Sequence, residues 1–160
     1  MFSLLFHTDV FMPTEAKNTA VILNQAMTGY FLSRHFEEHL NNQESEDRSH
    51  TYFAYAVLNS LNEMCSKYKK TLWPFEVEYS KDFHFFGRPG WFVTKYCVRV
   101  PYSLTDDLVI VIRPQWNKIS NTYDFDRNKI VTAWLNHKKD DHKTLDASKY
   151  CTEEKWLSCK

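Results

Sequence analysis

One histidine near the C-terminal end of the sequence has neighbours that suit proton transfer. His142 follows Asp141 and precedes Lys143 in a strongly polar segment. A carboxylate can orient an imidazole, and a nearby lysine can stabilise an oxyanion. In that setting His142 could take the proton of a ribose 2′-hydroxyl or protonate a leaving oxygen. The alternative interpretation is a solvated loop, in which mixtures of His, Lys and Asp are common.

Cationic residues also recur in and beside the segments that alternate like β-strands. They are Arg88, Lys95, Arg99 and Arg113. If Lys95 and Arg99 point away from the helices, they form a local basic patch that can hold phosphates and stabilise charge on a phosphorus centre. Stacking surfaces for unpaired bases could come from Trp91, Tyr96, Trp116 and Trp134. The competing interpretation is that the cations are ordinary exposed strand residues and the aromatic residues belong to the core.

A third pattern resembles a metal site. His35 and His39 are four residues apart in a predicted helix, a spacing that lets two imidazoles share a zinc ion, and residues 35–39 match His-x-x-Glu-His, the inverted zincin pattern. Such a site also needs a third ligand and a carboxylate base, for which Glu76 or Glu78 are candidates. Short motifs match by chance, and a charged, solvated helix end explains the same residues. We therefore expect no metal ion.

Composition excludes several classes of function. The 20 basic and 20 acidic residues balance, so there is no long-range attraction to nucleic acid or to an anionic membrane. Only 3 glycines occur, which argues against Rossmann and P-loop nucleotide sites, and we expect no organic cofactor. The 4 cysteines form no Cys-x-x-Cys pair, and a reduced, cytoplasmic protein is the expectation. No apolar run reaches the roughly 18–20 residues of a membrane span.

Hydrophobic periodicity predicts the elements that must position these residues. Apolar residues at helical spacing predict two helices, over about 14–40 and 46–70. Alternation then predicts strands at 75–79, 91–100, 108–113 and 129–136, with a further short strand at 1–6, a polar turn at 121–128 and a polar tail at 137–160. We thus predict a single α+β domain over 1–160, with two N-terminal helices packed on one face of a four- to five-stranded antiparallel sheet. The other face would be available for a ligand.

This order of elements, ending in a strand that reads Ile130-Val131-Thr132-Ala133-Trp134, resembles the barnase–EndoU–colicin–RelE group of RNases. Members of that group often carry Thr or Ser in a late strand of this pattern, and the resemblance covers about residues 75–150. The tail His142-Lys143-Thr144-Leu145-Asp146 is also similar to small phage proteins, which implies a host cytoplasm as the location. The group is often basic overall, whereas this chain is neutral.

The resemblance implies metal-independent cleavage of RNA, in which the 2′-hydroxyl attacks the adjacent phosphate. It carries over only Thr132, as a hydrogen-bonding residue. Charge and position suggest His142 as the base and Arg88 or Arg99 as the cationic stabiliser, with Lys95, Arg113, Lys143 and Trp134 as RNA-binding residues. The alternative is a non-catalytic phage-type protein that binds a host protein and inhibits or redirects it, because Trp, Tyr and Arg commonly anchor interfaces.

Overall fold

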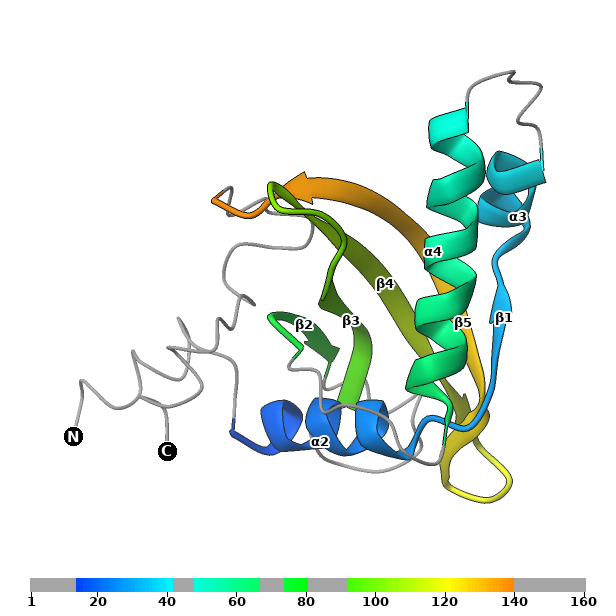
Figure 1. Cartoon of the computed structure of the whole chain (residues 1–160). Helices are drawn as coiled ribbons and strands as arrows, with labels where there is room; N and C mark the ends of the chain where they lie inside the picture. The colour runs from blue at the N-terminus through cyan, green and yellow to red at the C-terminus, as the bar shows by residue number, and fades with distance from the viewer. Residues whose placement is uncertain (1–13, 42–47, 67–73, 81–91, 140–160) are drawn as a thin grey trace.

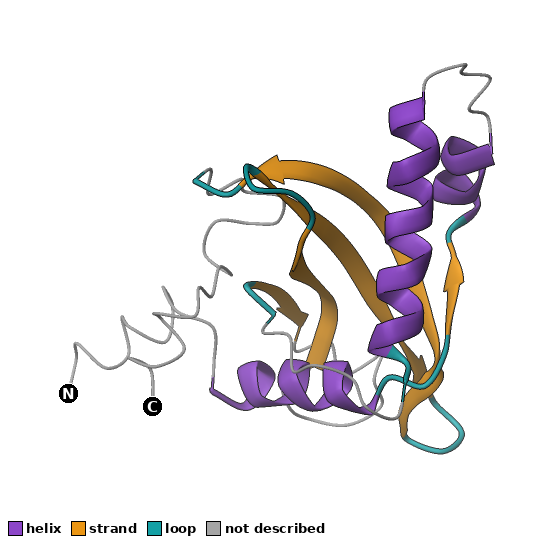
Figure 2. Cartoon of the chain, viewed as in Figure 1, coloured by secondary structure: helices purple, strands orange, loops and turns teal. Residues whose placement is uncertain are grey.

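Three helices and a five-stranded sheet make up the part of the chain that the computed structural model describes, residues 14–41, 48–66, 74–80 and 92–139 (Figures 1 and 2). The helices are α2 (Thr14–Ala26), α3 (Arg34–Asn41) and α4 (Arg48–Met64), and the strands are β1 (Tyr30–Leu32), β2 (Glu76–Ser80), β3 (Phe92–Pro101), β4 (Asp106–Asn117) and β5 (Thr122–His137). The strand order is β1-β5-β4-β3-β2, with β1 parallel to β5 and the other pairs antiparallel. The predicted α+β class is confirmed, but the sheet is mixed.

The prediction of one long helix over 14–40 is wrong, because β1 interrupts it. The Thr28 amide donates to the Phe125 carbonyl and the Ser33 amide donates to the Ile130 carbonyl, which draws the connection onto β5. Ser33 then caps α3, since its Oγ accepts a hydrogen bond of 3.1 Å from the Phe36 amide. The periodic apolar pattern continues through the break because residues on β1 and on both helices all face the same core.

Gly29 lies where β5 bulges against the connection between α2 and β1. The pairing of β4 with β5 shifts register between Arg113 and Gln115, so that residues 125–128 of β5 have no paired residue on β4 and form a bulge. The Asn128 side chain donates to the carbonyls of Gly29 and Phe125 across this contact. The predicted polar turn at 121–128 is therefore wrong: the turn precedes Thr122, and most of the segment is strand.

The core lies between the helices and one face of the sheet, as predicted. Figure 2 shows α4 crossing in front of the strands. Buried side chains from all three helices share one cluster with alternate residues of the central strands: Leu23, Phe36, Val57, Leu61, Tyr96, Val98, Leu108, Ile110, Ile112 and Ile130. This alternation leaves the intervening strand residues on the opposite face.

Two strands run longer than their apolar pattern predicts. β4 was expected to end at Pro114 but continues to Asn117, and β5 begins at Thr122 rather than Lys129. Proline has no amide hydrogen to donate to a ladder, and the register shift falls at Pro114. The strands continue past this position because Trp116 and Tyr123 pack edge-to-face, with ring centroids 5.0 Å apart.

Some expectations fall outside the described residues: the first strand at 1–6, the turn at 87–90 and most of the polar tail. Within the described segments, no helix is long and apolar enough to cross a membrane.

Tyr96 carries a buried hydroxyl in the core. Its side chain is fully buried, and its hydroxyl has no hydrogen-bond partner among the residues that the structure describes. Burial raises the pKa of Tyr96, and repulsion by Cys65 adds to the increase. We expect Tyr96→Phe to raise the free energy of unfolding by about 1 kcal/mol, because it removes an uncompensated polar group. Urea unfolding of both proteins measures this, and a loss of stability would mean that the hydroxyl has a partner.

Candidate functional site

The sheet face opposite the helices carries Lys95, Arg99, Arg113, Thr132 and Trp134, the described members of the predicted catalytic and RNA-binding set. Tyr96 and Trp116, which were candidate stacking surfaces, instead lie in or against the main core. Cys97 lies on this face, and alternation along β3 places Lys95 and Arg99 on the same side. Trp134 packs with Cys97, and Thr132 lies directly opposite Val111 of the same small cluster. Arg113 follows Ile112, which points into the main core, so Arg113 also faces away from the helices. We call this surface the outer face.

The strand register arranges the outer face in rows that cross the sheet. One row joins Arg113 and Lys129 and ends at Phe31 on the edge strand, and across β3 and β2 Lys95 pairs with Glu78. The next contains Glu76, Cys97, Val111 and Thr132. A third contains Arg99, Val109 and Trp134. Arg99 and Thr132 therefore lie in neighbouring rows, separated by β4.

The expectation that the outer face is available for a ligand does not hold at its middle, which is closed to solvent. Cys97 and Val109 are completely buried, and Val111 is only 2% exposed. Phe75, Val131 and Trp134 are partly buried against these three residues. The surface available to a ligand therefore lies mainly toward the two ends of the strands, while Thr132, at the β5 side of the central row, remains partly exposed.

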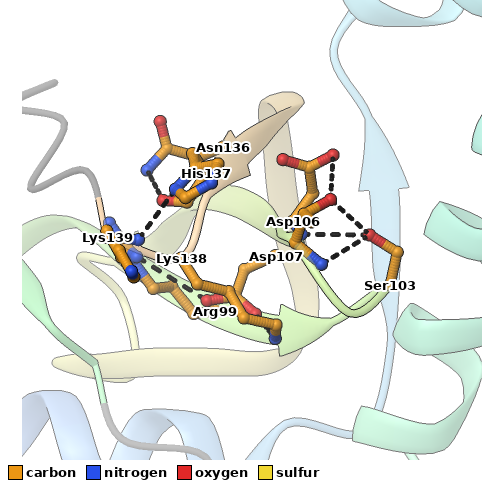
Figure 3. Close-up of polar contacts among 9 residues, drawn as sticks. Arg99, Ser103, Asp106, Asp107, Asn136, His137, Lys138 and Lys139 are labelled. Carbon is orange, nitrogen blue, oxygen red and sulfur yellow. Dashed lines mark hydrogen bonds and ion pairs between the residues drawn. The ribbon is translucent and has the colours of Figure 1, made fainter.

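Arg99 belongs to a charged cluster at the end of the sheet near the β3–β4 turn (Figure 3). Its guanidinium nitrogen is 3.6 Å from an Asp107 carboxylate oxygen, and the Lys138 ammonium is 2.6 Å from the other oxygen. The guanidinium also lies 4.8 Å from the centroid of the Phe75 ring, a cation–π contact. One carboxylate thus contacts two cations, and this group of three keeps a net charge of +1. Such a group can hold an anion while Asp107 and Phe75 keep the guanidinium in place.

Lys95 is more fully compensated. Its ammonium is 3.7 Å from one carboxylate oxygen of Glu78, and the Thr94 hydroxyl donates to the other oxygen over 2.9 Å. The Lys95 and Glu78 side chains are both about a quarter exposed, at 23% and 27%. The basic patch predicted from Lys95 and Arg99 is therefore largely neutralised at Lys95.

Cys97 shows how strongly the centre of the outer face excludes water. Burial raises the pKa of the Cys97 thiol, and the carboxylates of Glu76 and Glu78 raise it further while Lys95 lowers it. A raised thiol pKa favours folding below the pKa of the unfolded thiol, about 8.5, and this contribution is lost as the pH rises above it. Relative to Cys97→Ala, we expect the wild-type free energy of unfolding to fall by about 1.4 kcal/mol per pH unit above pH 9. Urea titrations between pH 8 and 10.5 test this, and parallel curves for the two proteins would contradict it.

The sequence analysis missed cations of the outer face at the β1 end. Lys129 pairs with both Phe31 and Arg113 in the ladder, and the Arg127 guanidinium lies 5.9 Å from the centroid of the Phe31 ring. Arg127 was assigned to a turn and Phe31 to a helix, so their alternation with neighbouring strand residues was not recognised. Lys138 and Asp107 were missed because only tertiary pairing joins them to Arg99.

The structure separates the two histidines of the predicted metal site from the carboxylates that were candidates to complete it. His35 and His39 are exposed on α3, which follows β1 at one edge of the sheet, whereas Glu76 and Glu78 lie on β2 at the other edge. Within the described ranges, no group of three or more His, Cys, Asp or Glu residues could hold a metal ion. Three of the predicted RNA-site residues, Arg88, His142 and Lys143, lie outside the described residues.

Comparison with known proteins adds no assignment: no family model, curated protein or solved structure matches this chain.

Proposed function

We propose that this protein is a metal-independent endoribonuclease that cleaves RNA on the outer face of its sheet. The observation that supports the proposal is the common location of Lys95, Arg99, Arg113, Thr132 and Trp134, which come from three adjacent strands and lie on one face. The cluster of Arg99, Asp107 and Lys138 supplies a positioned guanidinium. Such a group stabilises the negative charge that builds on the phosphate oxygens in the transition state.

The proposed reaction is a transfer of the phosphodiester from one ribose oxygen to another. The 2′-hydroxyl oxygen forms a bond to the adjacent phosphorus, and the bond from phosphorus to the 5′-oxygen of the next nucleotide breaks. His142 accepts the 2′-hydroxyl proton, and the leaving 5′-oxygen takes up a proton from water. The guanidinium of Arg99 stabilises the negative charge on the phosphate oxygens, and Thr132 donates a hydrogen bond to one of them. The products are a 2′,3′-cyclic phosphate end and a 5′-hydroxyl end.

The direct test incubates the purified chain with a 5′-labelled RNA of mixed sequence in the presence of EDTA. We expect fragments that end in 2′,3′-cyclic phosphate, and no cleavage of an RNA whose 2′-hydroxyls are methylated, because methylation removes the nucleophile. A preparation carrying His142→Ala controls for contaminating RNases. Equal cleavage by that variant, or full resistance of the unmodified RNA, would end the proposal.

The second candidate is a non-catalytic protein that binds a host protein in the cytoplasm. It is favoured by the buried centre of the outer face and by large exposed apolar side chains on α4, where Tyr52 is 67% and Tyr55 is 71% exposed. Exposed tyrosines on a helix are common interface anchors. This candidate predicts a stoichiometric complex with one host protein, lost on Tyr52→Ala/Tyr55→Ala, together with no RNA cleavage.

A further inference from the structure

The β1 end of the outer face gathers cations around an aromatic side chain. Arg113 and Lys129 face each other across β4 and β5, and Lys129 pairs with Phe31 on β1. The Arg127 guanidinium lies over the Phe31 ring at 5.9 Å from its centroid. We call Phe31, Arg113, Arg127 and Lys129 the edge strip. These residues come from three consecutive strands in the sheet order, so the strip runs across the sheet to its edge.

The cations of the edge strip differ from Lys95 and Arg99 in that no carboxylate of the described part of the chain compensates them. Arg99 and Lys95 each have a carboxylate oxygen within 4 Å, at 3.6 and 3.7 Å respectively. Among the residues that the structure describes, no carboxylate lies that close to Arg113, Arg127 or Lys129. Three cations on adjacent strands, with no ion-pair partner within the described segments, suit a ligand that brings several negative charges in a row.

Phe31 adds an apolar surface at the edge-strand end of these cations. It is 37% exposed although it lies in a strand, and its neighbours Tyr30 and Leu32 point to the main core. An exposed aromatic ring flanked by arginine and lysine offers a stacking surface for a base beside binding groups for its phosphate. Asp124 and Asp126 of β5 lower the local charge. The net positive charge around the edge strip is therefore modest, which favours a ligand that also stacks on the Phe31 ring.

We propose that the edge strip binds single-stranded RNA, with unpaired bases against Phe31 and consecutive phosphates on Lys129 and Arg113. Neighbouring strands lie about 4.8 Å apart, so the two cations can contact adjacent phosphates of one RNA strand. Arg127 contacts a phosphate or stacks on the next base. The inference rests on the proposed function, for which the edge strip directs the RNA strand across the sheet toward Thr132. A duplex is disfavoured because its bases are paired and stacked within the helix and cannot reach Phe31.

Binding is measured apart from cleavage, with a fluorescent 12-nucleotide RNA that carries 2′-O-methyl groups throughout. Fluorescence anisotropy gives its Kd for the full chain over a range of salt concentrations, with the matching duplex as a second probe. We expect Arg113→Gln/Lys129→Gln to weaken single-strand binding at least tenfold and to lower the salt slope by about 1.4, which corresponds to two phosphate contacts. Phe31→Leu should weaken binding about tenfold with an unchanged slope, and Phe31→Tyr should bind like wild type.

Arg34→Gln is the matched control, because Arg34 is a highly exposed cation on α3, its side chain 93% exposed. It should leave Kd within about twofold of wild type, and circular dichroism should show all variants folded. Equal binding by the double variant, equal loss in Arg34→Gln, or tighter binding of the duplex would overturn the inference. RNA cleavage by the same preparations separates the two proposals. If the wild type cleaves RNA but the edge-strip variants keep its Kd for single-stranded RNA, only the edge-strip proposal is refuted. If the variants weaken RNA binding but the wild type does not cleave RNA, only the nuclease proposal is refuted.

Discussion

Replacing Arg99 by Gln is expected to lower the rate constant of RNA cleavage by about 10²- to 10³-fold with a smaller change in KM. The reason is that a positioned charge acts mainly on the transition state, where negative charge builds on the phosphate oxygens. Asp107 and the Phe75 ring hold the Arg99 guanidinium before any ligand binds, at 3.6 Å and 4.8 Å respectively. Single-turnover cleavage in EDTA measures the rate constant without interference from product release.

Two further variants distinguish the role of Arg99 from a general effect of charge or of folding. Lys138→Gln removes the second cation on Asp107, whose contact is 2.6 Å, and should lower cleavage by less than about tenfold, because the Lys138 side chain is 37% exposed and its charge is screened by solvent. Arg99→Lys keeps the charge but loses the planar fork that can grip two phosphate oxygens, so it should fall between wild type and Arg99→Gln. Thermal unfolding of all three variants checks that they remain folded. A fully active Arg99→Gln would remove Arg99 from the site.

Replacing Gly29 by Ala is expected to lower the free energy of unfolding by about 1–3 kcal/mol, the usual cost of overpacking. A Cβ at this position would lie 2.5 Å from the carbonyl oxygen of Asp126 and 3.2 Å from its carbonyl carbon. Both are backbone atoms of the β5 bulge, and they cannot move without disturbing the hydrogen bonds that Asn128 donates to Gly29 and Phe125. Chemical unfolding followed by tryptophan fluorescence measures the loss.

The neighbouring residue supplies the control for Gly29. Thr28→Ala changes an exposed side chain and keeps the backbone hydrogen bond from the Thr28 amide to the Phe125 carbonyl, so it should change stability by less than about 0.5 kcal/mol. Hydrogen exchange locates the effect of Gly29→Ala. The Ser33 amide, which donates to Ile130 across β1 and β5, should exchange faster in this variant. Unchanged stability together with unchanged exchange would show that the bulge accommodates a methyl group.

Periodicity alone predicted the elements whose pattern is uniform. Residues 75–79, 91–100 and 129–136 alternate because one face packs against helices, whereas 108–113 form an apolar run that is buried on both faces up to Ile112. Each of these segments lies within or overlaps an observed strand. The second predicted helix overlaps α4, where Phe53, Val57, Leu61 and Met64 recur at helical spacing and are buried. The placement of Lys95 and Arg99 opposite Tyr96 and Val98 followed from the same period of two.

The break near Gly29 could not be predicted in this way, because its cause lies about 100 residues away in the sequence. The pairing of β1 with β5 and the contact between Gly29 and the β5 bulge replace helix by strand over residues that keep an apolar pattern. Propensity is a weak signal over three residues, so tertiary hydrogen bonds decide it.

In the candidate site, too, some features follow from the sequence and others only from the tertiary structure. The residue types, and the shared side of Lys95 and Arg99 within one strand, were determined by the amino-acid sequence, since alternation is a local property of an extended chain. The register of the sheet then placed Thr132 and Trp134 on the same face as Arg99. Only the tertiary structure decided which charges meet: Asp107 and Lys138 join Arg99, Glu78 joins Lys95, and Arg127 reaches Phe31. These partners come from different strands, and the strand order and register that bring them together depend on packing of the whole core.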